Sequence, residues 1–103
     1  MTRPQPALTL EAHADVLQAV QHYNEQQPLL GFEFLDEFEL TTQLIHETPL
    51  LSTLVDPPIR RALLKRFPYG VFFTPGSENE PDVIVAVMDL RQDPDVVRHA
   101  YKR

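Results

Sequence analysis

The sequence predicts an α+β fold with the element order βααβββ, in which a helical hairpin packs on one face of a small, mostly antiparallel sheet. The first half of the chain repeats its apolar residues with the period of a helix, whereas the second half is rich in Val, Ile and Phe and alternates with the period of a strand. With 103 residues, of which 43% are hydrophobic, the chain can build one modest core. We therefore expect a single domain over residues 1–103.

Residues 7–48 are expected to form a short strand followed by the helical hairpin. Residues 7–10 suit an extended segment, and Thr9 is placed to cap a helix over residues 11–27. A second helix is expected over residues 30–48, and each helix ends before a proline. Because only a few residues join the two helices, they must lie antiparallel.

Residues 59–90 are expected to form a three-stranded antiparallel meander. Two adjacent prolines, which lack backbone donors and have a restricted φ, make residues 50–58 a loop. Residues 91–103 form the C-terminal tail. Within it, residues 93–103 either form a final helical turn or stay frayed. The expected strands cover residues 59–67, 69–74 and 82–90.

Both faces of this expected sheet carry apolar side chains. Tyr69, Val71 and Phe73 share one face of the middle strand, while Phe72 lies on the other. A sheet that is apolar on both faces needs two covers, but the sequence supplies one helical hairpin. We expect the second face to be open and to receive a partner, either another chain or a second copy.

Charge is divided unevenly along the chain, whose net charge is −6. Residues 1–58 contain one base and nine acids, so the hairpin is acidic, whereas residues 59–103 contain eight bases and six acids. Non-specific nucleic-acid binding depends mainly on charge neutralisation, so we do not expect the chain alone to bind nucleic acid directly. An anionic partner should instead meet the basic group formed by Arg60, Arg61, Lys65 and Arg66.

Composition also bears on the classes of site that we expect. The chain has no Cys, and therefore no disulfide, thiolate zinc site or cysteine nucleophile. Its four His residues lack the i, i+4 spacing of a helical metal site, and we expect no metal and no cofactor. No apolar run suits a signal peptide or a membrane span, so we expect a cytoplasmic protein without membrane contact.

Four stretches of the sequence combine into one pattern that spans nearly the whole chain. They are Ala12-x-x-Asp15 with Tyr23, residues 30–37, residues 60–73 with the block Phe67-Pro68-Tyr69, and residues 85–88 followed by Arg91 and Asp93-Pro94. In this order and spacing they resemble the ParE/RelE superfamily of toxins from bacterial type II toxin–antitoxin modules. The resemblance implies a RelE/ParE-like fold and a toxin that a cognate antitoxin holds inactive by wrapping the open sheet face, in a hetero-oligomer.

The same resemblance implies two alternative activities. RelE-like members cleave mRNA on the ribosome, without a metal, and ParE-like members inhibit DNA gyrase. RNA cleavage needs a proton acceptor, cations that stabilise the crowded phosphate and a proton donor. The candidate catalytic residues for this alternative are Arg61, Lys65, Arg91 and Tyr101. Asp89 and Gln92, however, stand where many family members have His and a second Arg, and the charge of Asp89 would repel a phosphate.

We therefore predict the toxin component of a type II module that inhibits DNA gyrase by binding, without breaking a bond itself. The alternatives are a ribosome-dependent endoribonuclease and a decayed, non-toxic homologue that binds antitoxin. A purely structural alternative for the basic group is pairing with acids of the hairpin, and Phe67 and Tyr69 are expected to lie in the core. The target-binding residues would be Arg60, Arg61, Lys65, Arg66 and Arg91.

Overall fold

The computed structural model describes residues 3–103 and contains five strands and three α-helices in that range. A short 3-10 helix, η1, separates the helical hairpin from the main part of the sheet. The elements follow the order β1 (Ala7–Leu8), α1 (Leu10–Gln26), α2 (Leu30–Glu47), η1 (Pro49–Leu51), β2 (Thr53–Asp56), β3 (Ile59–Leu63), β4 (Tyr69–Thr74), β5 (Val83–Asp89) and α3 (Pro94–Tyr101).

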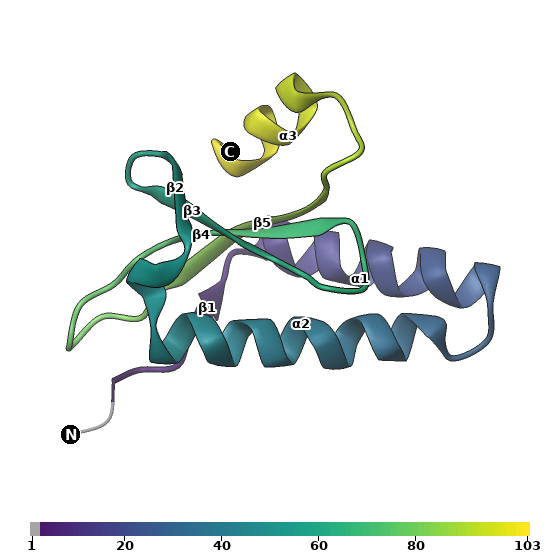
Figure 1. Cartoon of the computed structure of the whole chain (residues 1–103), viewed down its shortest axis with the longest axis horizontal. Helices are drawn as coiled ribbons and strands as arrows, with labels where there is room; N and C mark the ends of the chain where they lie inside the picture. Colours follow the sequence, from purple (N-terminus) through teal and green to yellow (C-terminus); the bar gives the residue numbers. More distant parts are fainter. Residues whose placement is uncertain (1–2) are drawn as a thin grey trace.

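The strands form one sheet in the order β1-β5-β4-β3-β2. β1 runs parallel to β5, and every other neighbouring pair is antiparallel. The helical hairpin covers one face of this sheet and α3 lies over the other (Figure 1). The expected α+β class, with a hairpin on one face of a mostly antiparallel sheet, is confirmed.

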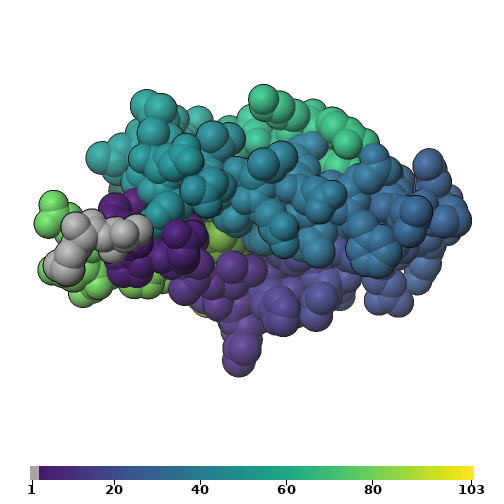
Figure 2. All heavy atoms as spheres, turned by 90° about the horizontal axis from the view of Figure 1, so that it is seen from below, coloured from purple at the N-terminus to yellow at the C-terminus, as the bar shows by residue number. Residues whose placement is uncertain are grey.

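The hairpin forms where the helical period predicted it. The side chain of Thr9 caps α1 by accepting a hydrogen bond from the Ala12 N–H at 3.1 Å. The two helices approach closely at Gly31, where an added Cβ would collide with the backbone oxygen of Val20. The Gly31 N–H also donates to the side chain of Asn24 at 2.7 Å. The helices lie side by side across the face of the molecule seen in Figure 2.

The main core lies between this hairpin and the sheet. Phe34 from α2 is fully buried against Tyr23 from α1, with ring centroids 5.7 Å apart. Phe67, in the loop between β3 and β4, meets both rings edge-on at 5.2 and 4.9 Å. Tyr69 packs against the same cluster but is only partly buried, so the expected core position is confirmed for Phe67, while Tyr69 lies at the edge of the core.

The segment that contains β2 and β3 differs from the prediction in two places. Residues 53–56, which were expected to lie in a loop, form the edge strand β2. The prolines at 57 and 58 occupy the turn between β2 and β3, where the missing backbone donors are not needed. β3 is also shorter than expected and ends at Leu63, because the carboxylate of Glu37 binds the backbone N–H groups of the two residues after Leu64.

The prediction that the second face of the sheet is open is wrong. Asp93 caps α3 by accepting a hydrogen bond from the Asp95 N–H at 2.8 Å, and a proline follows at the first helical position. The apolar side of this helix, formed by Val97, Ala100 and Tyr101, packs on the second face and builds a second, smaller core with Phe72 and Ala86. The tail is therefore helical, and the chain covers this part of its own sheet.

Candidate functional site

The basic group of residues 60–66 does not form one continuous surface. Arg60 and Arg61 are neighbours on β3, so their side chains leave the strand on opposite faces. The guanidinium of Arg60 donates to the backbone oxygen of Ser52 at 2.8 Å and to that of Leu50 at 3.3 Å. Arg60 therefore holds the connection from η1 to β2 against β3.

Arg61 lies on the same face as α3. It lines a hollow of about 580 Å³ beneath this helix, together with Phe72 and Tyr101. The stem of Arg61 crosses Gly70 on the neighbouring strand, where an added Cβ would lie 3.2 Å from its Cγ and Cδ. Within residues 3–103 its Nε is buried without a hydrogen-bond partner. Gly70 thus provides the space that Arg61 needs to lie flat on the sheet.

Lys65 and Arg66 lie in the loop after β3 and are positioned by two acids of α2. The Glu37 carboxylate accepts hydrogen bonds from both backbone N–H groups, at 3.1 and 3.2 Å for Arg66. Glu33 forms an ion pair with the Arg66 guanidinium at 3.0 Å. The structural alternative, pairing with acids of the hairpin, is therefore observed for Arg66, whereas Lys65 has no ion pair in the described part of the chain.

Arg91 is bound to Asp89, the acid that departs from the family pattern. Two guanidinium nitrogens donate to the Asp89 carboxylate at 2.7 and 3.1 Å. These hydrogen bonds lower the pKa of Asp89 and raise the pKa of Arg91. The cation expected after the last strand is therefore paired with an acid of the same chain.

Tyr101, the candidate proton donor, is buried in the second core. Its ring stacks on Phe72, and its hydroxyl lies 3.3 Å from a carboxylate oxygen of Asp56. Asp56 also pairs with Lys102 at 3.0 Å and with Arg98 at 3.6 Å. The hydrogen bond from Lys102 is the main reason why the pKa of Asp56 is lowered. The side chains at the end of α3 thus converge on one acid of β2.

The four candidate catalytic residues are not gathered in one hollow of the described structure. Arg61 and Tyr101 share the hollow beneath α3, whereas Lys65 lines one hollow against α2 and another between the loop after β3 and Leu90. Arg91 is bound to its own acid. In residues 3–103 no group of three or more acids and histidines is placed to hold a metal ion. None of the helices described is long and apolar enough to cross a membrane.

The structure also reveals a surface that the sequence reasoning did not single out. Four leucines with exposed fractions of 55–83% lie along the groove between α2 and β3 and line two adjoining hollows of about 400 and 480 Å³. A signal for part of it was present, because two of these leucines widen the apolar face of the second helix beyond a single stripe. We call this groove the leucine surface and define it by Leu40, Leu44, Leu51 and Leu63.

The elements described above define a small α+β fold with one helix on the far face of a five-stranded sheet. No protein-family model matches the sequence, and no curated protein matches it. Among solved structures, the fold is similar to that of a chain described as "Chromosomal ParDE TA system from P. aeruginosa", with a TM-score of 0.71 and 16% sequence identity. The likeness covers 86% of this chain and 96% of that chain. It confirms the RelE/ParE-like fold that the four stretches implied.

Proposed function

We propose that the protein is the toxin component of a bacterial type II toxin–antitoxin module and is neutralised by a cognate antitoxin protein. The observation that carries this proposal is the fold likeness to a chain of a ParDE system, which extends over 86% of the chain. The four stretches of sequence that resemble the same superfamily support it independently, because they were identified without the structure.

The leucine surface supports a protein partner. Leu44 on α2 and Leu63 on β3 face a common groove, and both are more than half exposed. Burying one leucine side chain contributes about 1.5–3 kcal/mol, so a partner that fills this groove gains considerable affinity. Since α3 already covers the second face of the sheet, we place the antitoxin on the leucine surface instead of on that face.

For the target we favour ParE-like inhibition of DNA gyrase by binding. A ribonuclease needs free cations around the phosphate, whereas Arg91 and Arg66 are each paired with an acid. Its proton donor would be Tyr101, whose hydroxyl already contacts Asp56. The loop after β3, with Lys65 exposed at its tip, is a suitable contact surface for a protein target.

The ribonuclease alternative rests on one observation. Arg61 and Tyr101 line the same hollow beneath α3, where a cation and a phenol would face a bound ligand. The alternative of a decayed homologue rests on a different observation, which is that Asp89 pairs with the cation Arg91 at the exit of β5. These two alternatives predict different outcomes in the experiment that follows.

The first experiment is bacterial growth after induction of this gene alone and together with the adjacent small gene. Growth arrest that the neighbour relieves supports the toxin, and unimpaired growth together with a stable complex supports the decayed homologue. Purified protein is then added to a gyrase supercoiling assay and to a ribosome-dependent mRNA cleavage assay. Loss of supercoiling without cleavage is the expected result, and cleavage without loss of supercoiling would replace gyrase by the ribosome.

A variant pair tests the leucine surface. Leu44→Lys should prevent rescue by the antitoxin, because a charge in the groove remains unpaired on binding, while toxicity itself persists. The matched control is Leu17→Lys on α1, since Leu17 and Leu44 are equally exposed at 57% and Leu17 lies outside the groove. If both variants are rescued equally, the antitoxin does not bind the leucine surface.

A further inference from the structure

The outer edge of β5 is covered by β1 at only two of its seven residues. β1 pairs with β5 at Val83 and Ile84, and the chain then turns away into α1. Within residues 3–103, the remainder of β5, up to Asp89, has β4 on its inner side and no strand on its outer side. An unpaired strand edge presents backbone donors and acceptors to which another extended segment can bind.

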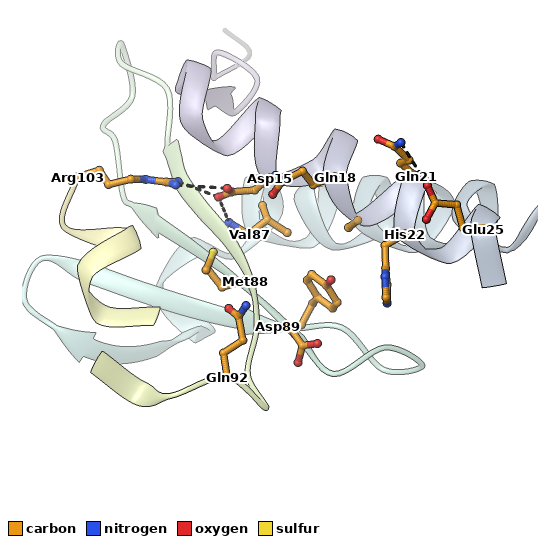
Figure 3. A pocket seen from close by; sticks show the side chains of 12 residues that line it. Asp15, Gln18, Gln21, His22, Glu25, Val87, Met88, Asp89, Gln92 and Arg103 are labelled. Atoms are coloured by element: carbon orange, nitrogen blue, oxygen red, sulfur yellow. Dashed lines mark hydrogen bonds and ion pairs between the residues drawn. The ribbon is translucent and has the colours of Figure 1, made fainter. Parts of the chain in front are cut away.

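Two side chains bind backbone groups at the start of the part of the β5 edge that has no strand partner. Asp15 from α1 accepts a hydrogen bond from the Val87 N–H at 3.0 Å, and the C-terminal residue, Arg103, donates to the backbone oxygen of Val85 at 3.1 Å. The two side chains also form an ion pair at 2.8 Å. Figure 3 shows Arg103 reaching across to Asp15 beside β5. Together they satisfy groups that would otherwise bind a neighbouring strand.

The next backbone groups along this edge also point outward. In an antiparallel strand the N–H and C=O of one residue point to the same side, and successive residues alternate. The Val87 N–H points to Asp15, and the Leu90 N–H points to β4 because it binds the Pro68 oxygen at 2.7 Å. The Val87 C=O and the Asp89 N–H therefore face outward, into a groove of about 510 Å³ between α1 and β5.

The lining of this groove is suited to a cationic guest. Asp15 and Glu25 contribute carboxylates, whereas the carboxylate of Asp89 is already bound to Arg91. The chain's own Arg103 is the cation bound at the end of the groove. The Asp15 side chain is only 11% exposed, whereas that of Arg103 is 28% exposed. Arg103 is thus the more easily displaced member of the pair.

We propose that this groove binds an extended segment of a partner protein, which adds as a strand to the outer edge of β5 and places an arginine or lysine side chain on Asp15 in place of Arg103. That the partner is the antitoxin rests on the proposed function, and the segment bound here is then distinct from the part of the antitoxin that fills the leucine surface. The binding chemistry itself rests on the strand edge and the charge of the groove. The partner's backbone binds the Val87 C=O and the Asp89 N–H, and its cation binds the Asp15 carboxylate.

Arg103 then acts as a competitor built into the chain. The apparent affinity of a guest is reduced by the fraction of molecules in which its site is already filled. An ion pair between partly exposed side chains favours the arrangement in which Arg103 is bound to Asp15 only several-fold over the arrangement in which it is released. Removal of the Arg103 side chain should therefore tighten guest binding by about fivefold.

The test uses a short blocked peptide, acetyl-Thr-Val-Arg-Val-Thr-amide, and the same peptide with neutral citrulline in place of arginine. Binding to the full chain is followed by NMR through the amide signals of Val87 and Asp89. Arg103→Ala should bind the arginine peptide about fivefold more tightly than the unmodified chain. Asp15→Asn, which keeps an oxygen for the Val87 N–H but removes the charge, should weaken that binding by about tenfold or more.

The matched control is Lys102→Ala, which removes the neighbouring cation that pairs with Asp56 and should leave peptide affinity unchanged. Equal binding of the arginine and citrulline peptides, equal affinity of Arg103→Ala and the unmodified chain, or shifts confined to other amides would each overturn the proposal. Growth arrest is a separate readout. A chain that arrests growth but does not bind the peptide refutes the groove alone, and one that binds the peptide without arresting growth refutes the toxin alone.

Discussion

The ring of Tyr101 stacks on the ring of Phe72, with centroids 4.8 Å apart and planes inclined by 22°. Phe72 belongs to β4, in the middle of the sheet, and Tyr101 is the last residue of α3. This contact joins the C-terminal helix to the centre of the sheet and covers part of the face that the hairpin leaves uncovered. Both residues are largely buried, at 2% and 9% exposed.

Truncation of Tyr101 should therefore loosen α3. We expect Tyr101→Ala to lower the free energy of unfolding by about 2–4 kcal/mol, because it removes a buried ring and its stacking contact with Phe72. Tyr101→Phe keeps the ring and loses only the contact with Asp56, which should cost about 1 kcal/mol or less. Urea denaturation of the three proteins measures both effects, and equal stabilities of the two variants would show that stacking contributes nothing.

Asp56 should make the stability of α3 sensitive to acid. The hydrogen bond from Lys102 holds the pKa of Asp56 below its ordinary value of 3.8 in the folded protein. A carboxylate with a lowered folded-state pKa stabilises the fold above the unfolded-state pKa, and this contribution is lost as the pH falls through the folded-state value. We expect the free energy of unfolding to decrease below about pH 4, and to decrease less in Asp56→Asn. Identical pH profiles from denaturation between pH 2 and pH 6 would contradict this.

The fully buried Asp82 depends on Arg3 near the start of the chain. Its carboxylate pairs with the Arg3 guanidinium at 2.9 Å and accepts from the Gly76 N–H at 2.7 Å. Arg3→Ala leaves a buried acid without its cation and should destabilise the fold by about 1–3 kcal/mol. Gln5→Ala removes a neighbouring exposed hydrogen bond to His46 and should change stability by less than about 0.5 kcal/mol. Thermal unfolding distinguishes the two, and equal melting temperatures would refute the dependence.

Leu29, between the two helices of the hairpin, offers a stabilising substitution. It has a φ of 71° and is the one non-glycine residue with positive φ among residues 3–103. Its side chain is 66% exposed, so little packing is lost when it is replaced. Leu29→Gly relieves left-handed strain of about 1 kcal/mol, which should raise the melting temperature by several degrees. Leu10→Gly, at an exposed position without positive φ, should lower it instead.

The sequence predicted the hairpin and the last two strands because their signals are local. Thr9 precedes a helical period, and the alternating residues of β4 and β5 are bounded by prolines and turn residues. β2 was missed because its four residues have no pattern of their own and become a strand only by pairing with β3. Asp93-Pro94 is a local signal for the start of a helix. The length of α3 and its packing on Phe72 could not be predicted from such a signal.

The candidate site was predicted less completely than the fold. The basic residues were identified by type, but their partners lie far away in the sequence: Glu33 for Arg66, and the backbone of Ser52 for Arg60. The leucine surface was missed because exposure is decided by which helix face meets the sheet. The pair of Asp15 and Arg103 was also missed, since 88 residues separate its members in the chain.

By itself the sequence determined the class of fold, the helical hairpin and the superfamily that the chain resembles, because periodicity, capping residues and turn residues act over a few positions. Only the tertiary structure decided that α3 covers part of the second face and that Arg91 and Arg66 pair with acids. It also decided that, within residues 3–103, β5 has no strand on its outer side beyond the residues paired with β1. These features depend on contacts between distant residues, where burial and electrostatic pairing are set by the packing of whole elements.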